Sequence, residues 1–193
     1  TMGNFERRPD LAKLSVSVCE GNKKRGFSGG IGMFKTFMAL IGTEISEAIE
    51  ADRKNRRADF ESYRQICSQY YGQFDKDAFE VHIKDTLEDE IADVVIRILD
   101  AYPRGEFNFD DLGNAASVSL GADYFNEEQS ICDQLFDAVY VLTMRELPKS
   151  LILSCLLSFM EKFCDCHDID LWFHVGIKLE YNATRNHKHG KEY

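Results

Sequence analysis

The stretch from Leu40 to Arg53 reads LIGTEISEAIEADR, the pattern of an amphipathic helix. Its apolar residues recur at spacings of three and four, the period of a helix that packs on one side. Glu44 and Glu47 lie three residues apart beside this apolar stripe, so their carboxylates share a face of the helix. Two carboxylates next to a low-dielectric core repel each other unless a cation lies between them. Alone, this helix is consistent with a metal-binding face and with an ordinary solvated acidic face.

A second segment carries the same arrangement of acids. Residues Phe79 to Tyr102 have a strong apolar helical period, and Pro103 is expected to stop the helix. On this segment, Glu90 and Asp93 lie three residues apart beside the apolar stripe. If the two helices pack antiparallel, four carboxylates converge between them, and only cations can offset the repulsion among such buried charges.

The chemistry of these ligands favours a particular class of metal. Carboxylate oxygens without histidine or cysteine favour Mg²⁺ or Mn²⁺ over zinc. The Glu-x-x-His motif of di-iron carboxylate bundles is missing from both segments. The candidate metal ligands are Glu44, Glu47, Glu90 and Asp93. Glu50 has two open interpretations, a further ligand or a solvated acid that pairs with Arg53 or Lys54.

Helical periodicity extends over most of the 193 residues, and no stretch alternates as a strand does. We expect an all-α fold, a four-helix-bundle-like core with additional helices, in a single domain over residues 1–193. Residues 59–76 are expected to form an inserted arm, whereas residues 106–168 supply extra helices without an assigned role. The expected helices cover residues 10–19, 33–55, 59–71, 79–102, 126–145, 148–167 and 171–186.

Composition restricts the classes of partner. Acids outnumber bases 33 to 23, a formal charge of −10, which argues against binding of polymeric nucleic acid or anionic membranes. The most apolar run, Leu151 to Phe159, is too short to span a bilayer. The first residues are charged and lack the apolar core of a signal peptide, so we expect a cytoplasmic protein.

The six cysteines contain no CxxC pair, and most lie in apolar helical runs, where free cysteine behaves as a small buried hydrophobe. The one metal-like cluster among them is Cys164-Asp165-Cys166 next to His167, which we interpret as structural residues rather than a zinc site.

The two acidic pairs, Glu44-x-x-Glu47 followed by Glu90-x-x-Asp93, resemble the MazG-like family of all-α nucleoside triphosphate pyrophosphohydrolases. The C-terminal pattern KLEYNATR (residues 178–185) followed by HGK (residues 189–191) is similar to the tail signature of several members. The segment NKKRGF (residues 22–27) resembles the lead-in to their first acidic helix. The resemblance covers roughly residues 10–102 and 170–193, and the segment between the acidic pairs is longer than the family's compact hairpin.

The resemblance implies a Mg²⁺-dependent enzyme that hydrolyses a (d)NTP to the (d)NMP and pyrophosphate. It also implies a homodimer or homotetramer. Metal ions on the four acids can clamp phosphates and lower the pKa of a bound water, and Glu47 is the candidate to accept the proton. The base and the sugar stay open, since dUTP, dCTP and phosphoribosyl-ATP hydrolysis would use similar ligands.

The C-terminal segment supplies candidates for substrate binding. Lys178, Asn182 and Arg185 have offsets of four and three, so they are expected to share one helix face, and Lys191 follows in the tail. A solvated basic face at the end of a helix is the alternative interpretation. The aromatic candidates to stack on a base are Phe27, Trp172 and Phe173, although aromatic residues on helices usually lie in the core.

Two other classes of protein fit the same residues. One is a non-catalytic nucleotide-binding or regulatory helical module that keeps the metal site as a sensor. The other is a helical interaction protein whose acids are merely solvated.

Overall fold

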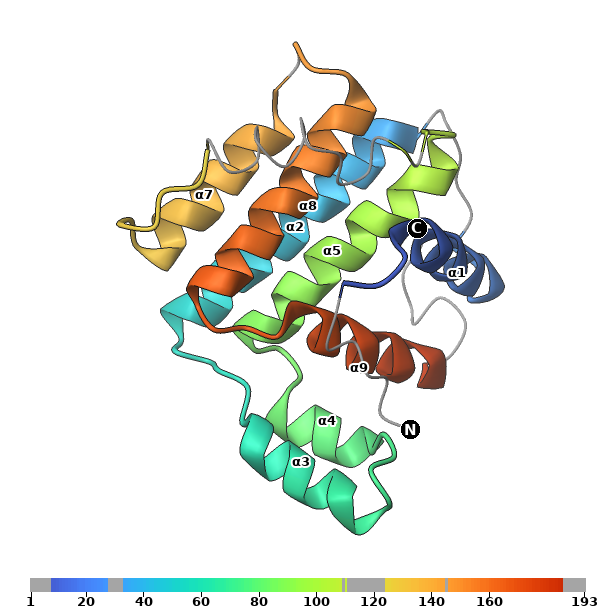
Figure 1. The fold of residues 1–193 in the computed structure, drawn as a ribbon, viewed down its shortest axis with the longest axis vertical. Helices are drawn as coiled ribbons and strands as arrows, with labels where there is room; N and C mark the ends of the chain where they lie inside the picture. Colours follow the sequence, from blue (N-terminus) through green and yellow to red (C-terminus); the bar gives the residue numbers. More distant parts are fainter. Residues whose placement is uncertain (1–7, 28–32, 109, 111–123, 145, 186–193) are drawn as a thin grey trace.

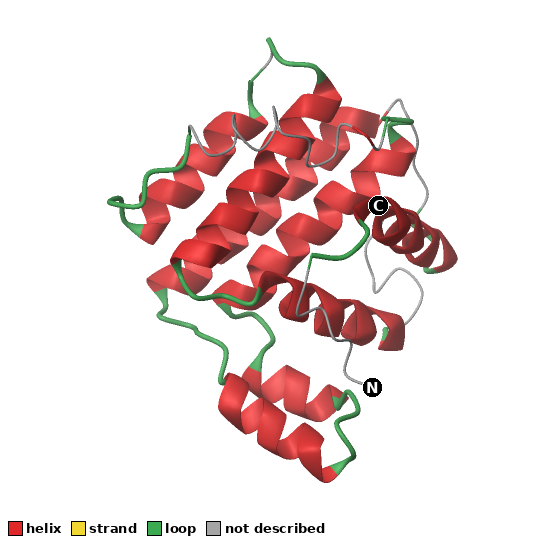
Figure 2. Ribbon diagram, viewed as in Figure 1, coloured by secondary structure: helices red, strands yellow, loops and turns green. Residues whose placement is uncertain are grey.

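The computed structural model describes residues 8–27, 33–108, 110, 124–144 and 146–185, and every regular element longer than one turn among them is an α-helix (Figure 2). The prediction of an all-α fold with a bundle-like core is therefore confirmed. The helices are α1 (Leu11–Lys24), α2 (Phe34–Arg53), α3 (Phe60–Gln69), α4 (Lys76–His82), α5 (Leu87–Arg104), α7 (Ile131–Leu142), α8 (Lys149–Cys166) and α9 (Leu171–Thr184).

Helix α5 is the centre of the bundle. It contacts α1, α2, α8 and α9, whereas α7 packs against α2 and α8 on the outside (Figure 1). Residues at neighbouring positions of α5, such as Ile91, Ala92, Val94 and Val95, are all buried, so more than one face of the helix is covered. Helices α2 and α5 run in opposite directions, which is the packing that brings their acidic pairs to the same space (Figure 1).

The single long helix predicted for residues 79–102 is wrong, because the chain breaks between α4 and α5. Thr86 is the N-cap of α5, and its hydroxyl accepts a hydrogen bond from the Asp89 backbone N–H. The preceding residue, Asp85, has φ 61°, a left-handed conformation that no α-helix contains. The pattern Thr-x-x-Asp is a capping-box signature of a helix N-terminus. The break was not predicted because apolar residues recur at helical spacing on both sides of this pattern.

Helix α1 is longer than predicted, because it continues past Cys19 to Lys24. A glycine inside a helix costs about 1 kcal/mol relative to alanine, so Gly21 weakens this helix without ending it. The extension carries Asn22 and, just after the helix, Arg25 toward α5 and α9. Further along the chain, α7 begins five residues later than expected, at Ile131 after the Ser130 cap.

Helices α3 and α4 form a small antiparallel pair at one end of the molecule (Figure 1). Their apolar faces enclose a second, smaller core that includes Tyr63, Phe79 and two residues of α9, Ile177 and Tyr181. The Phe79 and Tyr181 rings stack with centroids 4.5 Å apart. The arm predicted for residues 59–76 thus extends through α4, and it is packed against α9. Most of residues 106–124, for which the sequence predicts no helix, lie outside the described residues.

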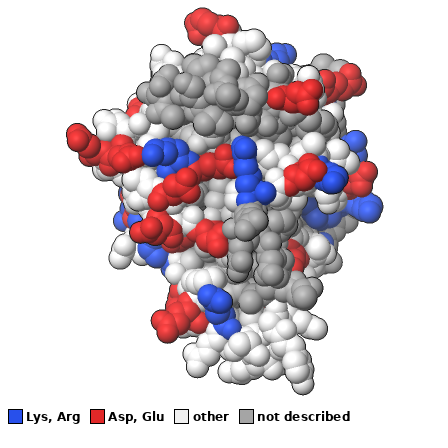
Figure 3. Space-filling model, viewed as in Figure 1, with Lys and Arg blue, Asp and Glu red and all other residues white. Residues whose placement is uncertain are grey.

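Among the described helices, none combines the length and the apolar character that a bilayer-crossing segment needs. On the face drawn in Figure 3, acidic and basic side chains lie next to one another in small groups.

Candidate functional site

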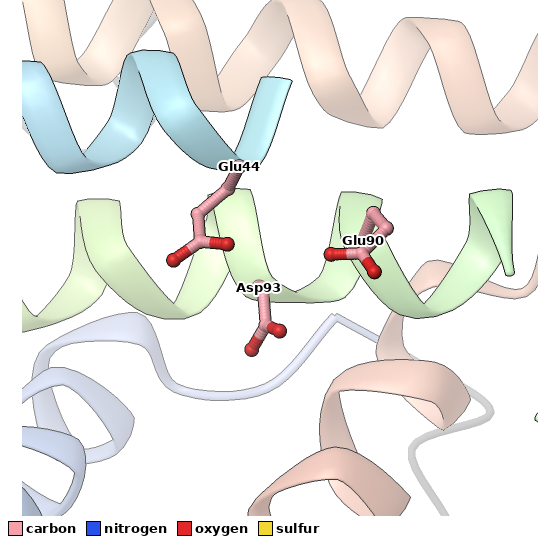
Figure 4. Close-up of side chains that lie close together, drawn as sticks. All are labelled: Glu44, Glu90 and Asp93. Carbon is pink, nitrogen blue, oxygen red and sulfur yellow. The ribbon is translucent and has the colours of Figure 1, made fainter. Parts of the chain in front are cut away.

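Three of the four predicted metal ligands converge. Glu44 from α2 and Glu90 and Asp93 from α5 each place a carboxylate oxygen within 4.8 Å of the others (Figure 4). Glu44 and Glu90 are each only 6% exposed. The i, i+3 spacing on α5 puts two acids on one face, and the antiparallel α2 supplies the third.

Glu47 and Glu50 lie in different surroundings. Glu47 is exposed and lines the same cavity as the three converging acids, but its carboxylate is not part of their close group. Glu50 pairs with Arg53 at 3.1 Å and with Lys54 at 2.9 Å, and it does not line the cavity. The solvated interpretation of Glu50 therefore fits its position.

Lys178 of α9 reaches into the acidic cluster. Its Nζ donates to Asp89 Oδ2 at 2.8 Å and lies 2.7 Å from Asp93 Oδ2, and the residue is 5% exposed. Burial alone lowers the pKa of an ammonium, but the Asp93 and Asp89 carboxylates raise the pKa of Lys178 above its usual range. Lys178 was predicted to meet phosphate oxygens, and in this structure it meets carboxylate oxygens.

Burial changes the proton affinity of the converging acids. It raises the pKa of Glu90 to about 8, with the Asp93 carboxylate acting in the same direction. The pKa of Glu44 is also raised, mainly by burial and by Asp93, although Arg97 opposes this shift. Arg97 Nε donates to Glu44 Oε1 at 2.9 Å. Acids of this kind bind a proton or a cation readily, since either one relieves the cost of burying a negative charge.

The cluster opens into a cavity of about 210 Å³ between α1, α2, α5 and α9. The predicted substrate-binding residues Lys178, Asn182 and Arg185 all line it, as does Phe27. Arg185 comes directly after the last residue of α9. It lines the cavity, but it does not lie on the helix face that it was predicted to share with Lys178 and Asn182. Lys191 and the histidines of the tail lie outside the described residues.

Several lining residues were missed by sequence reasoning: Asn22, Arg25, Lys84, Asp85, Ile96, Arg97 and Tyr181. Asn22 and Arg25 belong to the segment 22–27 of the resemblance, but they were not assigned to the site because α1 was expected to end earlier. Lys84 and Asp85 were missed because the break between α4 and α5 was not anticipated. Arg97 had a signal in the sequence, since it lies one helical turn after Asp93 on the same face.

A second acidic group shares one ligand with the first. Asp85, Asp89 and Glu90 also place carboxylate oxygens within 4.8 Å of one another. Asp89 is 1% exposed, and its Oδ1 has no hydrogen-bond partner among the described residues. Dense oxygen donors, one of them unsatisfied, fit a hard divalent cation such as Mg²⁺ or Mn²⁺.

The remaining candidates lie elsewhere. Trp172 is 8% exposed in the main core, and Phe173 packs on Phe60 with ring centroids 4.7 Å apart, so neither ring lines the acidic cavity. Cys164 is buried, and His167 shares a hydrogen bond with Gln134 at 2.7 Å. Within the described part of the chain, these residues do not form a metal-binding group.

Comparisons of this chain with protein-family models, with curated proteins and with solved structures give no match.

Proposed function

We propose that the chain is a Mg²⁺-dependent nucleoside triphosphate pyrophosphohydrolase that converts a (d)NTP to the (d)NMP and pyrophosphate. One observation carries the proposal: Glu44, Glu90 and Asp93 converge within 4.8 Å in a cavity that Asn182 and Arg185 also line. A site for a metal-bound polyphosphate needs two kinds of group: acids that hold the metal, and hydrogen-bond donors that meet the phosphate oxygens. This cavity has both.

The acids would hold the metal, with Mn²⁺ as a substitute. A triphosphate is itself a polyanion, so carboxylates at this density repel it unless a divalent cation lies between them. Mg²⁺ held there would neutralise phosphate oxygens and increase the acidity of a water. Glu44, Glu90 and Asp93 are the candidate ligands, and Asp85 and Asp89 extend the acidic group on one side.

The cations around the cavity would position the phosphates. Arg185 and Arg25 line it as half-exposed guanidinium groups, which bind phosphate through two parallel hydrogen bonds. Lys178 would exchange its carboxylate partners for a phosphate oxygen once a metal neutralises Asp93. Glu47 is exposed within the cavity and outside the close group, so its carboxylate is available to accept a proton from the attacking water.

One observation favours a second candidate, a non-catalytic nucleotide-binding module. Lys178 and Arg97 already pair with Asp93 and Glu44, so part of the acidic charge is balanced without a metal. A module of this kind would bind a nucleotide with Mg²⁺ and leave it intact. For either candidate, we expect a homodimer or homotetramer, as the resemblance implies, and a location in the cytoplasm.

The experiment that separates the two candidates follows a nucleotide panel by ³¹P NMR with Mg²⁺ present, alongside thermal unfolding. The enzyme yields pyrophosphate and a monophosphate from at least one (d)NTP. The binding module yields a raised melting temperature with an unchanged ³¹P spectrum. If no nucleotide yields product and none stabilises the protein, both candidates are excluded.

A further inference from the structure

A second cavity lies away from the acidic cluster, beside the N-terminal end of α9. It has a volume of about 270 Å³. Its walls come from the loop before α3, the first turn of α5, the connection from α8 to α9, and α9 itself. The cavity is lined by acidic and aromatic residues and a buried histidine: Phe60, Glu88, Asp168, Asp170, Phe173 and His174.

His174 has a buried ring nitrogen, Nδ1, that lacks a hydrogen-bond partner within the described part of the chain. The residue is 5% exposed. Burial lowers the pKa of His174 to about 4, so the imidazole is neutral at pH 7. A buried polar atom without a partner costs free energy, and a ligand that supplies a hydrogen bond removes this cost.

The charged groups of this cavity are acids. Glu88 accepts a hydrogen bond from the Ala58 backbone N–H at 2.9 Å, and Asp170 Oδ1 accepts one from the Phe173 N–H at 3.1 Å. Asp168 is exposed at the junction of α8 and α9. Each carboxylate has a second oxygen beyond these bonds, so the side chains of the cavity offer mainly hydrogen-bond acceptors.

The nearby cations have partners of their own. Arg57 Nη2 lies 2.6 Å from Asp52 Oδ1, and the Arg64 guanidinium lies 5.2 Å from the centroid of the Phe60 ring. His167, the other imidazole of the cavity, has its pKa lowered by burial and by Arg57. Neither arginine is among the residues that line the cavity, whose charged lining residues are Glu88, Asp168 and Asp170, so the lining has a negative balance at pH 7.

The arrangement suits an organic cation better than a metal ion. Within the described part of the chain, no three potential ligands of this cavity lie within 4.8 Å of one another, which is too dispersed for a single divalent ion. The Phe60 and Phe173 rings, in edge-to-face contact, supply aromatic surface that attracts organic cations.

We propose that this second cavity binds a small organic cation with several N–H donors, an alkylguanidinium or alkylammonium, between Glu88, Asp168 and Asp170 and against His174 and the two phenylalanine rings. This site is independent of the proposed pyrophosphohydrolase activity, since it shares no lining residue with the acidic cavity.

Isothermal titration calorimetry with three matched probes tests the site: butylguanidinium, butylammonium and the neutral butylurea. We expect at least one cation to bind and butylurea not to bind.

Glu88→Gln and Asp168→Asn should each weaken binding by about 10-fold, since each removes a charged acceptor. Both changes keep the local geometry, because Gln can still accept from Ala58 and Asn tolerates the positive φ of Asp168. Glu20→Gln, an exposed acid of α1 outside the cavity, is the matched control and should leave binding unchanged.

A second readout follows His174 directly. On addition of the cation that binds, the ¹⁵N resonance of His174 Nδ1 should shift as it gains a hydrogen bond, and His174→Phe should lose affinity while the core keeps an aromatic ring. The proposal is overturned if no probe binds at millimolar concentration, if butylurea binds as tightly as the cations, or if the Glu88 and Asp168 variants bind like the wild type.

Discussion

Lys178 Nζ lies 2.7 Å from Asp93 Oδ2, so a cation of α9 is paired with a carboxylate of α5 that is a candidate metal ligand. The same ammonium donates to Asp89 at 2.8 Å. Lys178 thus links α9 to the centre of the bundle, and it supplies positive charge to the acidic cluster.

Replacing Lys178 by Met should destabilise the metal-free protein. Removing one partner of a buried ion pair leaves an uncompensated charge, at a cost of about 3–5 kcal/mol in the free energy of unfolding. Urea denaturation measures this change, and the exposed Lys35→Met is the matched control. The double variant Lys178→Met/Asp89→Asn should recover part of the loss. A Lys178→Met protein as stable as the control would show that the pair contributes nothing.

The stability of the metal-free protein should fall as the pH rises from about 6.5 to 8. Burial and Asp93 raise the pKa of Glu90 to about 8, so the folded protein holds a proton that the unfolded chain has released. A raised folded-state pKa gives stability that is complete below the unfolded pKa, and this stability is lost as the pH passes the folded value. Glu44, with its raised pKa, acts in the same direction.

Urea denaturation across this pH range, with and without Mg²⁺, measures the effect. The slope should be smaller for Glu90→Gln, which cannot ionise. Mg²⁺ should stabilise the wild type more at pH 8 than at pH 6.5, because metal ligands must be deprotonated. An identical pH dependence in wild type and Glu90→Gln would show that Glu90 is ionised throughout.

His174 should act in the opposite direction and at lower pH. Burial lowers its pKa to about 4, so the stability it contributes is present above the unfolded pKa of about 6.5 and is lost as the pH falls toward 4. The fall in melting temperature between pH 6.5 and 4 should be smaller for His174→Phe than for the wild type. If the melting temperatures of the two proteins fall equally between pH 6.5 and 4, a group other than His174 causes the loss of stability.

The stack of Phe79 on Tyr181 should couple the arm to the acidic cavity. Phe79 is fully buried, so Phe79→Ala should cost about 3–5 kcal/mol in the free energy of unfolding. At temperatures where the variant is folded, nucleotide affinity should also fall, because Tyr181 and Lys178 on α9 both line the cavity. Phe136→Ala, on the exposed face of α7, is the control. If a folded Phe79→Ala protein binds nucleotide with unchanged affinity, the arm does not influence the acidic cavity.

Glu47 and Glu50 form a natural pair for testing the proton acceptor. Both are acids of α2 one turn apart, but only Glu47 lines the cavity. Glu47→Gln should lower the rate of pyrophosphate release by about 10²- to 10⁴-fold, the usual contribution of a general base, whereas Glu50→Gln should change it little. Equal losses in both variants would exclude the assignment of Glu47.

The sequence could predict the part of the site that depends on local spacing. Glu90 and Asp93 share a face whatever the tertiary structure, and one antiparallel contact is enough to add Glu44. Partners far apart in the chain carry no such signal: nothing in the sequence pairs Lys178 with Asp89 or Arg97 with Glu44. The break at Thr86 was missed because the apolar period continues across it, while the cap that interrupts it depends on a single hydroxyl.

The most direct test is Mg²⁺-dependent pyrophosphate release from a panel of common nucleoside and deoxynucleoside triphosphates, measured in parallel on the wild type and Asp93→Asn. We predict release from at least one nucleotide by the wild type, its loss on chelation of Mg²⁺, and its absence in Asp93→Asn under conditions where both proteins are folded. Release by the wild type that never exceeds the Asp93→Asn background, with any nucleotide, would contradict the proposed activity.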